Sequence, residues 1–519
     1  MTSLTKISLI DGFDNEPVST EELISEMQSL KKKRSVKKKK SDDNLPLSDR
    51  LRIAEENTYK VLGRYKGFVR VIYYYDELHD YISKAIEINY LSLDTETNKS
   101  VDPLTCKMVG LCLYVPNTKP VYVPIYHIIP GTEELLPNLV TISQITEEFK
   151  RLVDNNTKIV YHNAKFDIRV CANVTGVYLP VWWDTMLASQ LLDENIPANL
   201  KYQFRLRVDV TVDTYNIEQL YKNVRYEEVN PEVFALYAAT DSYDTYLLQQ
   251  YQQKIFEQLD LTRLYNLFLN IETPVSLVVA HMEDDGIAVD LDFVKRLNDK
   301  YEVQLNKNLN KLYEMCKPYT NQIRKYQEQK KLDNPINFDS DKQLKIVLYD
   351  IMKTTPVDEK KSTEKEVLKA INTDFTNTIL TYRHYSKLIN AFTSKLPTWI
   401  SEKDNKIHAS FNQLGTEDRN VRTGRFSSTN PNLQQMPSKE KSMRLSFMGE
   451  TKYDDNEVKD NCIVVKDYSE IETTNDWKNS SEINIGDIII ANENEKETHF
   501  TVTETEKQDN NIIIYVEER

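Results

Sequence analysis

The chain has few cysteines and lacks a long hydrophobic run. Its five cysteines are scattered without the spacing of a zinc site or a disulfide framework: Cys106, Cys112, Cys171, Cys316 and Cys462. We find no apolar run of about 18 residues and no cleavable signal pattern, which argues against membrane insertion or export. A reducing cytoplasm therefore fits the sequence, and we expect no membrane partner.

Positive charge is also in the minority. The net charge is -14, from 66 basic and 80 acidic residues. This balance does not exclude a nucleic-acid enzyme, because phosphate binding depends on a local basic surface and metal-holding acids add negative charge. A length of 519 residues, 40% of them hydrophobic, indicates two or three globular domains.

The first informative pattern is a pair of acids at the end of a predicted strand. Tyr90 to Leu93 alternates in polarity, and Asp94 and Glu96 follow it. An acid at a strand end is more often a helix cap or a surface charge, so this motif alone is a weak indication. Two further acid motifs, arriving in order along the chain, strengthen it.

Each further motif joins a polar residue to an acid four residues later. Asn163 stands before Asp167, and Tyr237 before Asp241. On a helix this spacing places both side chains on one face, so both motifs could point at the acids on the strand. Strands and helices alternate from about residue 80 to residue 250, which predicts an α/β layer fold.

Acids pooled in one pocket repel each other strongly unless hard divalent cations lie between them. Two magnesium-class ions roughly 3.5–4 Å apart can activate a water and stabilise the leaving oxygen of a phosphodiester. Such a site needs no histidine or cysteine. The hydroxyl of Tyr237 suits the orientation of the attacking water or the scissile phosphate.

Together the three motifs resemble the proofreading 3′-5′ exonuclease domain of family A DNA polymerases, within the DEDD exonuclease group. The third motif matches the YxxxD variant. The resemblance implies a ribonuclease H-like α/β domain and two Mg²⁺ ions, with Mn²⁺ as the alternative. It implies metal-binding and catalytic roles for Asp94, Glu96, Asp167 and Asp241, a catalytic role for Tyr237, and a DNA contact at Asn163.

The second half of the chain is predicted to be mostly helical at first. From Phe293 to about Lys330 an apolar stripe recurs at four-residue steps, namely Leu297, Tyr301, Leu305, Leu309 and Tyr313. A stripe of this kind is typical of core packing. Thr363 and Glu366 predict a capping box at the start of another helix. The order of these segments resembles the thumb of family A polymerases.

The segment from Arg422 to Pro437 is rich in small, polar and basic groups, broken by Gly424 and Pro431. On composition alone, this segment is equally consistent with an ordinary surface loop and with a loop that contacts DNA. The string closely resembles the TGRxSSxxPNLQNIP element with which family A polymerases hold the primer-template. The resemblance assigns DNA contacts to Arg422, Arg425, Asn432, Gln435 and Arg444.

Next, Ile463 to Val465 forms an apolar strand that ends near Asp467, and this resembles polymerase motif A. The resemblance implies that Asp467 binds the metals of nucleotidyl transfer and that Glu472 selects the nucleotide sugar. After Glu472 the expected fingers helix and second metal-binding acid do not follow. The remaining residues 473–519 are acidic, with predicted strands at Ile485 to Ile490 and Ile512 to Val516.

Two accounts of this tail remain open. It is read-through into an intervening sequence, or the start of an intein, since its strands are similar to the early strands of splicing domains. Thr473 is a poor first nucleophile compared with cysteine or serine, which weakens the second account. Such an interruption resembles a bacteriophage replication enzyme, in which case the protein acts in the host cytoplasm.

We therefore predict four segments. Residues 1–55 form a disordered basic extension, 56–258 the exonuclease domain, 259–472 an incomplete polymerase domain of thumb and partial palm, and 473–519 a non-polymerase tail. The expected function is that of the N-terminal part of a family A DNA polymerase with proofreading activity. This chain should degrade 3′ ends of DNA without extending a primer.

The expected partner is DNA, as single-stranded 3′ ends and primer-template. Deoxynucleotides bind only if the missing fingers and palm are supplied, for instance by a second polypeptide. Two alternatives were weighed. A ribonuclease D-like exoribonuclease would carry a different domain after the acid motifs, and the segment from Arg422 to Pro437 argues against it. A non-catalytic DNA-binding scaffold would be expected to have lost an acid, whereas all four are present.

Overall fold

The computed structural model describes residues 45–209, 217–357, 360–414, 424–436, 443–444 and 446–447, and strands between 462 and 518. Its contacts define two compact units. The first comprises Met1–Asp285 with Ser410–Thr429, and the second Gly286–Ala409 with Asn430–Arg519. The division after Asp285 differs from the predicted boundary after residue 258.

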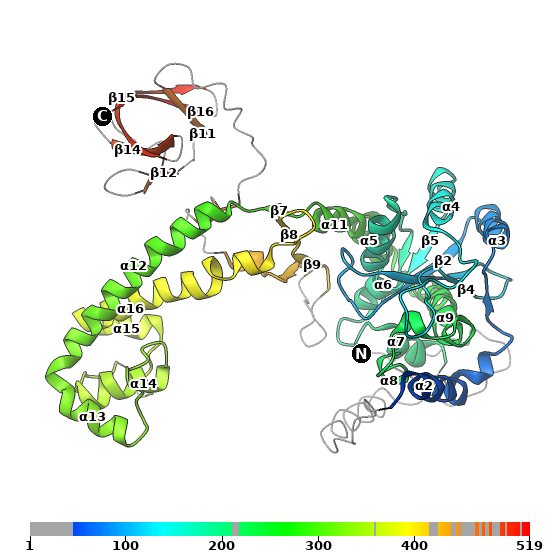
Figure 1. Cartoon of the computed structure of the whole chain (residues 1–519), viewed down its shortest axis with the longest axis horizontal. Coiled ribbons are helices and arrows are strands. Elements are labelled where there is room, and N and C mark those ends of the chain that lie inside the picture. Colours follow the sequence, from blue (N-terminus) through cyan, green and yellow to red (C-terminus); the bar gives the residue numbers. More distant parts are fainter. Residues whose placement is uncertain are drawn as a thin grey trace. The chain divides into compact units, whose positions relative to one another are not determined.

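A six-stranded mixed sheet with the order β1-β4-β3-β2-β5-β6 organises the first unit (Figure 1). Its strands are Arg70–Val71 (β1), Leu91–Thr97 (β2), Met108–Tyr114 (β3), Val121–Pro124 (β4), Ile159–Tyr161 (β5) and Trp183–Asp184 (β6). Central β2 is antiparallel to β3 and parallel to β5. The alternation of strands and helices predicted from the sequence is therefore confirmed.

The helices of this unit include α2 (Leu47–Leu62), α3 (Tyr75–Ile88), α4 (Ile142–Asp154), α5 (Ala164–Thr175), α6 (Thr185–Leu192), α7 (Leu200–Arg207), α8 (Ile217–Leu220), α9 (Pro231–Gln258), α10 (Thr262–Leu267), the π-helical η4 (Phe268–Glu272) and α11 (Thr273–Asp285). Helix α2 overlaps the segment 1–55 for which we predicted disorder. Ala54 of α2 is buried in a core cluster, so the predicted end of that segment has to be corrected.

The sheet separates two hydrophobic clusters. Leu91 and Leu93 of β2 pack with Ile168 of α5 and with residues of α3 and α4. On the other face, Cys112 of β3 packs with Phe234 of α9 and with residues of α2. Because side chains alternate along a strand, the even-numbered residues of β2 face α9. This alternation determines which β2 side chains, Asp94 and Glu96 among them, lie on the face toward α9.

The second unit contains a long helix, α12 (Leu291–Cys316), followed by α13 (Thr320–Glu328), α14 (Asp341–Lys345), η6 (Ile346–Ile351), α15 (Lys365–Ile371), α16 (Asp374–Leu388) and η7 (Ile389–Thr393). The stripe on α12 lies in two core clusters, as predicted. The predicted capping box of Thr363 and Glu366 is wrong, because the N-cap residue of α15 is Glu364 and its side chain forms no capping hydrogen bond. Thr363 instead donates a hydrogen bond to Asp341 at 2.7 Å.

Three strands of the tail, β14 (Ile488–Glu493), β15 (Lys496–Gln508) and β16 (Asn511–Glu518), form an antiparallel sheet with β11 (Cys462–Lys466), the strand that resembles motif A, in the order β11-β16-β15-β14. β12 (Glu470–Glu472) pairs with β13 (Trp477–Asn479). The β-rich character predicted for the tail is confirmed. Within the described part of the chain, no helix is long and apolar enough to cross a bilayer.

Candidate metal centre

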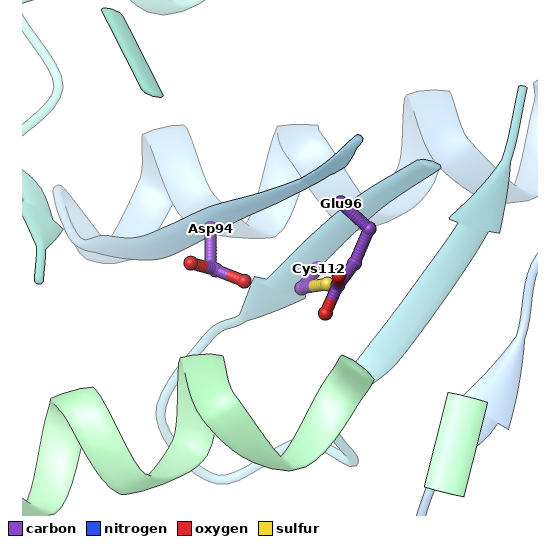
Figure 2. A group of neighbouring side chains, drawn as sticks. All are labelled: Asp94, Glu96 and Cys112. Atoms are coloured by element: carbon purple, nitrogen blue, oxygen red, sulfur yellow. The ribbon is translucent and has the colours of Figure 1, made fainter. Parts of the chain in front are cut away.

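Strand β2 carries the two acids of the first motif on the face toward α9. Asp94 pairs with Cys112 in the register of β2 and β3. A carboxylate oxygen of Asp94, one of Glu96 and the Cys112 sulfur all lie within 4.8 Å of one another. Figure 2 shows both carboxylates pointing to the same side of the strand. The predicted pairing of these acids is therefore present in the structure.

Helix α5 brings Asp167 to β2 from the opposite face of the sheet. Its carboxylate accepts hydrogen bonds from the Thr95 backbone N–H at 3.0 Å and from the Thr95 hydroxyl at 2.6 Å. Thr95 lies between the two acids of β2, and its side chain points away from theirs. These bonds fix the first turn of α5 against the strand and leave Asp167 only 2% exposed.

The position of Asn163 differs from the prediction. Helix α5 begins at Ala164, so Asn163 is the residue before the helix, in the left-handed region with a φ of 76°. Its backbone N–H donates to Asp184 at 3.1 Å. The four-residue spacing on a helical face therefore does not apply to Asn163 and Asp167, and the expectation that Asn163 faces the acids through that spacing is corrected.

Helix α9 supplies both residues of the third motif, as predicted. Asp241 forms an ion pair with Lys201 of α7. The Lys201 ammonium also lies 3.1 Å from a carboxylate oxygen of Asp244, which is buried. The same nitrogen is 5.5 Å from the centre of the Tyr237 ring. Tyr237 and Asp241 are thus linked through one lysine that the sequence analysis did not identify.

The electrostatics of the group reflect its burial and crowding. Burial and then repulsion by Asp167, Glu96 and Asp241 raise the pKa of Asp94 well above its usual range. Burial and the charge of Asp241 do the same to the pKa of Glu96. Burial raises the pKa of Asp167 to about 7, although its bonds to Thr95 oppose the shift. A nearby cation would relieve this repulsion.

The donor set fits a hard divalent metal. Carboxylate oxygens are the ligands that magnesium-class ions prefer, and those of Asp94 and Glu96 lie close together here. Burial raises the pKa of the Cys112 thiol well above its ordinary value, so this group stays protonated. A neutral thiol is a poor partner for such an ion, and Cys112 belongs to the core cluster around α9. We therefore regard the acids, and not Cys112, as the candidate ligands.

Four of the residues assigned to DNA contacts lie in described stretches of the chain, namely Arg425, Asn432, Gln435 and Arg444. Arg425 is exposed and precedes β10 (Ser427–Thr429), which pairs with β9 (Ser410–Asn412). Asn432 accepts the backbone N–H of Gln434 at 3.1 Å and so caps a short turn. Gln435 and Arg444 are exposed.

Three sequence-assigned residues lack a described side chain. Arg422 and Asp467 lie outside the described residues, and for Glu472 only the backbone of β12 is described.

Lys201 and Asp244 are the site residues that sequence reasoning missed. Asp244 follows Asp241 by three residues, which on a helix places them on one face. That spacing was the available signal for Asp244. Lys201 lies 40 residues before Asp241 along the chain, and no local pattern connects the two.

Two segments of the chain match known protein families. Residues 69–257 match the 3′-5′ exonuclease family, and residues 303–474 match DNA polymerase family A. DNA polymerase I of Borreliella burgdorferi is 27% identical over 417 residues, which cover 76% of this chain and 40% of that protein. DNA polymerase I of Synechocystis is 30% identical over 400 residues, covering 73% and 36%. The chain thus spans less than half the length of these relatives.

A solved structure has a similar fold. It is the POL domain of Pol1 from M. smegmatis in complex with DNA primer-template and dNTP. The TM-score is 0.52 at 20% sequence identity, and the likeness covers 76% of this chain and 59% of that one. At this identity the likeness concerns the fold.

Proposed function

Because the chain belongs to DNA polymerase family A and carries its 3′-5′ exonuclease domain, we propose that residues 56–258 remove 3′-terminal nucleotides from DNA by two-metal hydrolysis. One observation supports this most strongly. Asp94 and Glu96 project together from β2, while Asp167 is bonded to the residue between them. Four acids from β2, α5 and α9 would hold two Mg²⁺ ions, with Mn²⁺ as the alternative: Asp94, Glu96, Asp167 and Asp241.

The metals would supply an activated water and stabilise the leaving oxygen of the phosphodiester. The protein's own contribution is to hold the acids in place before DNA arrives. Tyr237 would orient the attacking water or the scissile phosphate through its hydroxyl. Burial and the nearby charge of Asp241 raise the pKa of Tyr237 well above its usual value, so the hydroxyl keeps its proton as a hydrogen-bond donor.

On the polymerase side, we propose that Arg422, Arg425, Asn432, Gln435 and Arg444 hold primer-template DNA. Asp467 would bind a metal of nucleotidyl transfer, and Glu472 would select the sugar. Transfer in this family needs a second acid and a basic fingers helix, so these 519 residues by themselves should not extend a primer. Binding of dNTP would require the remaining fingers and palm.

The experiment uses the purified chain with Mg²⁺ on a 3′-labelled single strand and on a primer-template with four dNTPs. We expect shortening of both substrates and no extension. Asp94→Ala should lower the hydrolysis rate by about 10³-fold, because a lost ligand removes several kcal/mol of transition-state stabilisation. Binding of a single strand should persist.

The matched control is Asp80→Ala, which removes an exposed acid of α3 in the same unit. It should hydrolyse DNA at the rate of the unchanged chain. Undiminished hydrolysis by the Asp94→Ala chain would mean that the metals bind elsewhere. Efficient primer extension would overturn the proposal for the polymerase side.

A further inference from the structure

A half-buried lysine contacts a carboxylate that the proposed metal needs. Lys201 is the second residue of α7, and its side chain is 21% exposed. Its ammonium contacts two carboxylates on the same face of α9. One belongs to Asp241, and the other to Asp244, whose oxygen lies 3.1 Å away. Asp241 is a proposed metal ligand, whereas Asp244 belongs to none of the three acid motifs.

The charge of Lys201 affects the whole acid cluster. It counteracts the rise in pKa that burial imposes on Asp94 and Glu96, the two acids of β2. It also acts on His162, whose pKa is lowered to about 3 by burial and then by this lysine. Lys201 itself stays charged, because the carboxylates of Asp241 and Asp244 outweigh the effect of its burial. The ammonium therefore supplies the kind of compensation that a metal would supply.

We propose that Lys201 is a tethered cation that competes with the metal for Asp241 and transfers to Asp244 when the metal binds. This inference depends on the proposed function, since it takes Asp241 as a metal ligand. A divalent ion bound to the Asp241 oxygen that Lys201 contacts would repel the ammonium strongly. Asp244 provides a second acceptor within reach of the same side chain, so Lys201 can leave Asp241 and remain paired. Lys201 is thus a positioning residue that holds Asp241 and Asp244 together through one ammonium before metal arrives.

A plain structural role makes a different prediction. If the ion pair only joined α7 to α9, its loss would loosen α9 and weaken metal binding at Asp241. A competing cation has the opposite effect, because its removal frees Asp241 and takes one positive charge away from the metals. The sign of the change in metal affinity therefore separates the two roles.

The test measures binding of Mn²⁺ to the full chain, from the electron paramagnetic resonance signal of the free ion. Lys201→Gln should bind Mn²⁺ about tenfold more tightly than the unchanged chain, since one unit charge a few Å away is removed in a partly screened site. Without metal, its melting temperature should fall, because the acids lose their counter-ion. Its rise in melting temperature at saturating Mn²⁺ should be larger than that of the unchanged chain.

A second variant examines the alternative acceptor. Asp244→Asn leaves Lys201 with Asp241 alone, so Mn²⁺ should bind more weakly. Because Asp244 acts through Lys201, this loss should shrink in the double variant Lys201→Gln/Asp244→Asn, which completes a double-mutant cycle. An equal loss in both backgrounds would contradict the transfer to Asp244.

Lys158→Gln is the control for net charge. Lys158 is exposed, and its ammonium lies 4.7 Å from the centre of the Trp182 ring. This variant should leave the affinity for Mn²⁺ unchanged. If Asp241→Asn removes Mn²⁺ binding but Lys201→Gln leaves it unchanged or weaker, the inference about Lys201 is wrong and the metal site stands. If neither Asp94→Asn nor Asp241→Asn alters Mn²⁺ binding, the proposed function fails first.

Discussion

At the residue scale, one buried histidine sets a pH limit on stability. The fully buried ring of His127 donates from Nδ1 to the Val229 carbonyl at 3.0 Å and accepts at Nε2 from the Tyr122 hydroxyl at 2.8 Å. Both bonds require the neutral ring with its proton on Nδ1. Burial lowers the pKa of His127 to about 4. A proton therefore binds this ring more readily in the unfolded chain.

The contribution of His127 to stability is present above about pH 6.5 and is lost as the pH falls toward about 4. At pH 5, protonation of His127 in the unfolded chain lowers the free energy of unfolding by about 2 kcal/mol. The free energy of unfolding in urea, measured at pH 7 and pH 5, checks this value. His127→Gln should be less stable at pH 7 but should lose about 2 kcal/mol less between the two pH values. An equal loss in both chains would exclude His127 as the cause.

The sequence motifs contain the four proposed metal acids but not the cation that lies among them. Asp94, Glu96, Asp167 and Asp241 lie within short motifs, so local spacing was sufficient to identify them. The contact of Lys201 with Asp241 depends on how α7 packs against α9, which local spacing does not encode. The predicted orientation of Asn163 was wrong because this residue is not part of α5. The helix begins at Ala164, and the backbone of Asn163 is in the left-handed region.

At the scale of elements, a buried ion cluster holds α5, α11 and β9 together. One Glu283 oxygen accepts from Lys165 and from the Phe411 backbone N–H, both at 2.6 Å, and the other accepts from Arg169 at 2.5 Å. The Glu283 side chain is 1% exposed. These contacts explain why the first unit extends to Asp285 and includes β9. The predicted boundary after residue 258 rested on local patterns, which do not report such contacts.

Glu283→Ala should lower the free energy of unfolding of the first unit by about 3 kcal/mol, because it removes the buried carboxylate that Lys165 and Arg169 share and leaves Arg169 paired with Asp284 alone. Denaturant unfolding measures this loss. Asp374→Ala is the comparison, because it removes an exposed acid paired with Lys311 at 2.7 Å. Its cost should stay below about 1 kcal/mol. Similar costs for the two variants would mean that the cluster around Glu283 contributes little.

At the scale of the whole molecule, each unit has hydrophobic clusters of its own. The clusters around β2 and α9 belong to the first unit, and those along α12 and α16 to the second. Alternating polarity predicted β2, and the apolar stripe at four-residue steps predicted α12. The predicted strand through Leu91 and Leu93 is β2, which continues to Thr97. The pairing of β11 with β16 joins segments far apart in sequence, and strand patterns alone do not fix such partners.

Because the four acids of the proposed exonuclease site lie in the first unit, metal bound there should stabilise that unit alone. We expect calorimetry to resolve two unfolding transitions, of which Mn²⁺ at about 100 times its dissociation constant stabilises one by about 2.7 kcal/mol. Asp94→Ala should abolish that shift. Phe338→Ala, at a fully buried ring of the second unit, should lower only the other transition, by about 3–5 kcal/mol. A metal shift in both of two resolved transitions would show that metal also stabilises the second unit, and the assignment of metal binding to the first unit alone would be wrong.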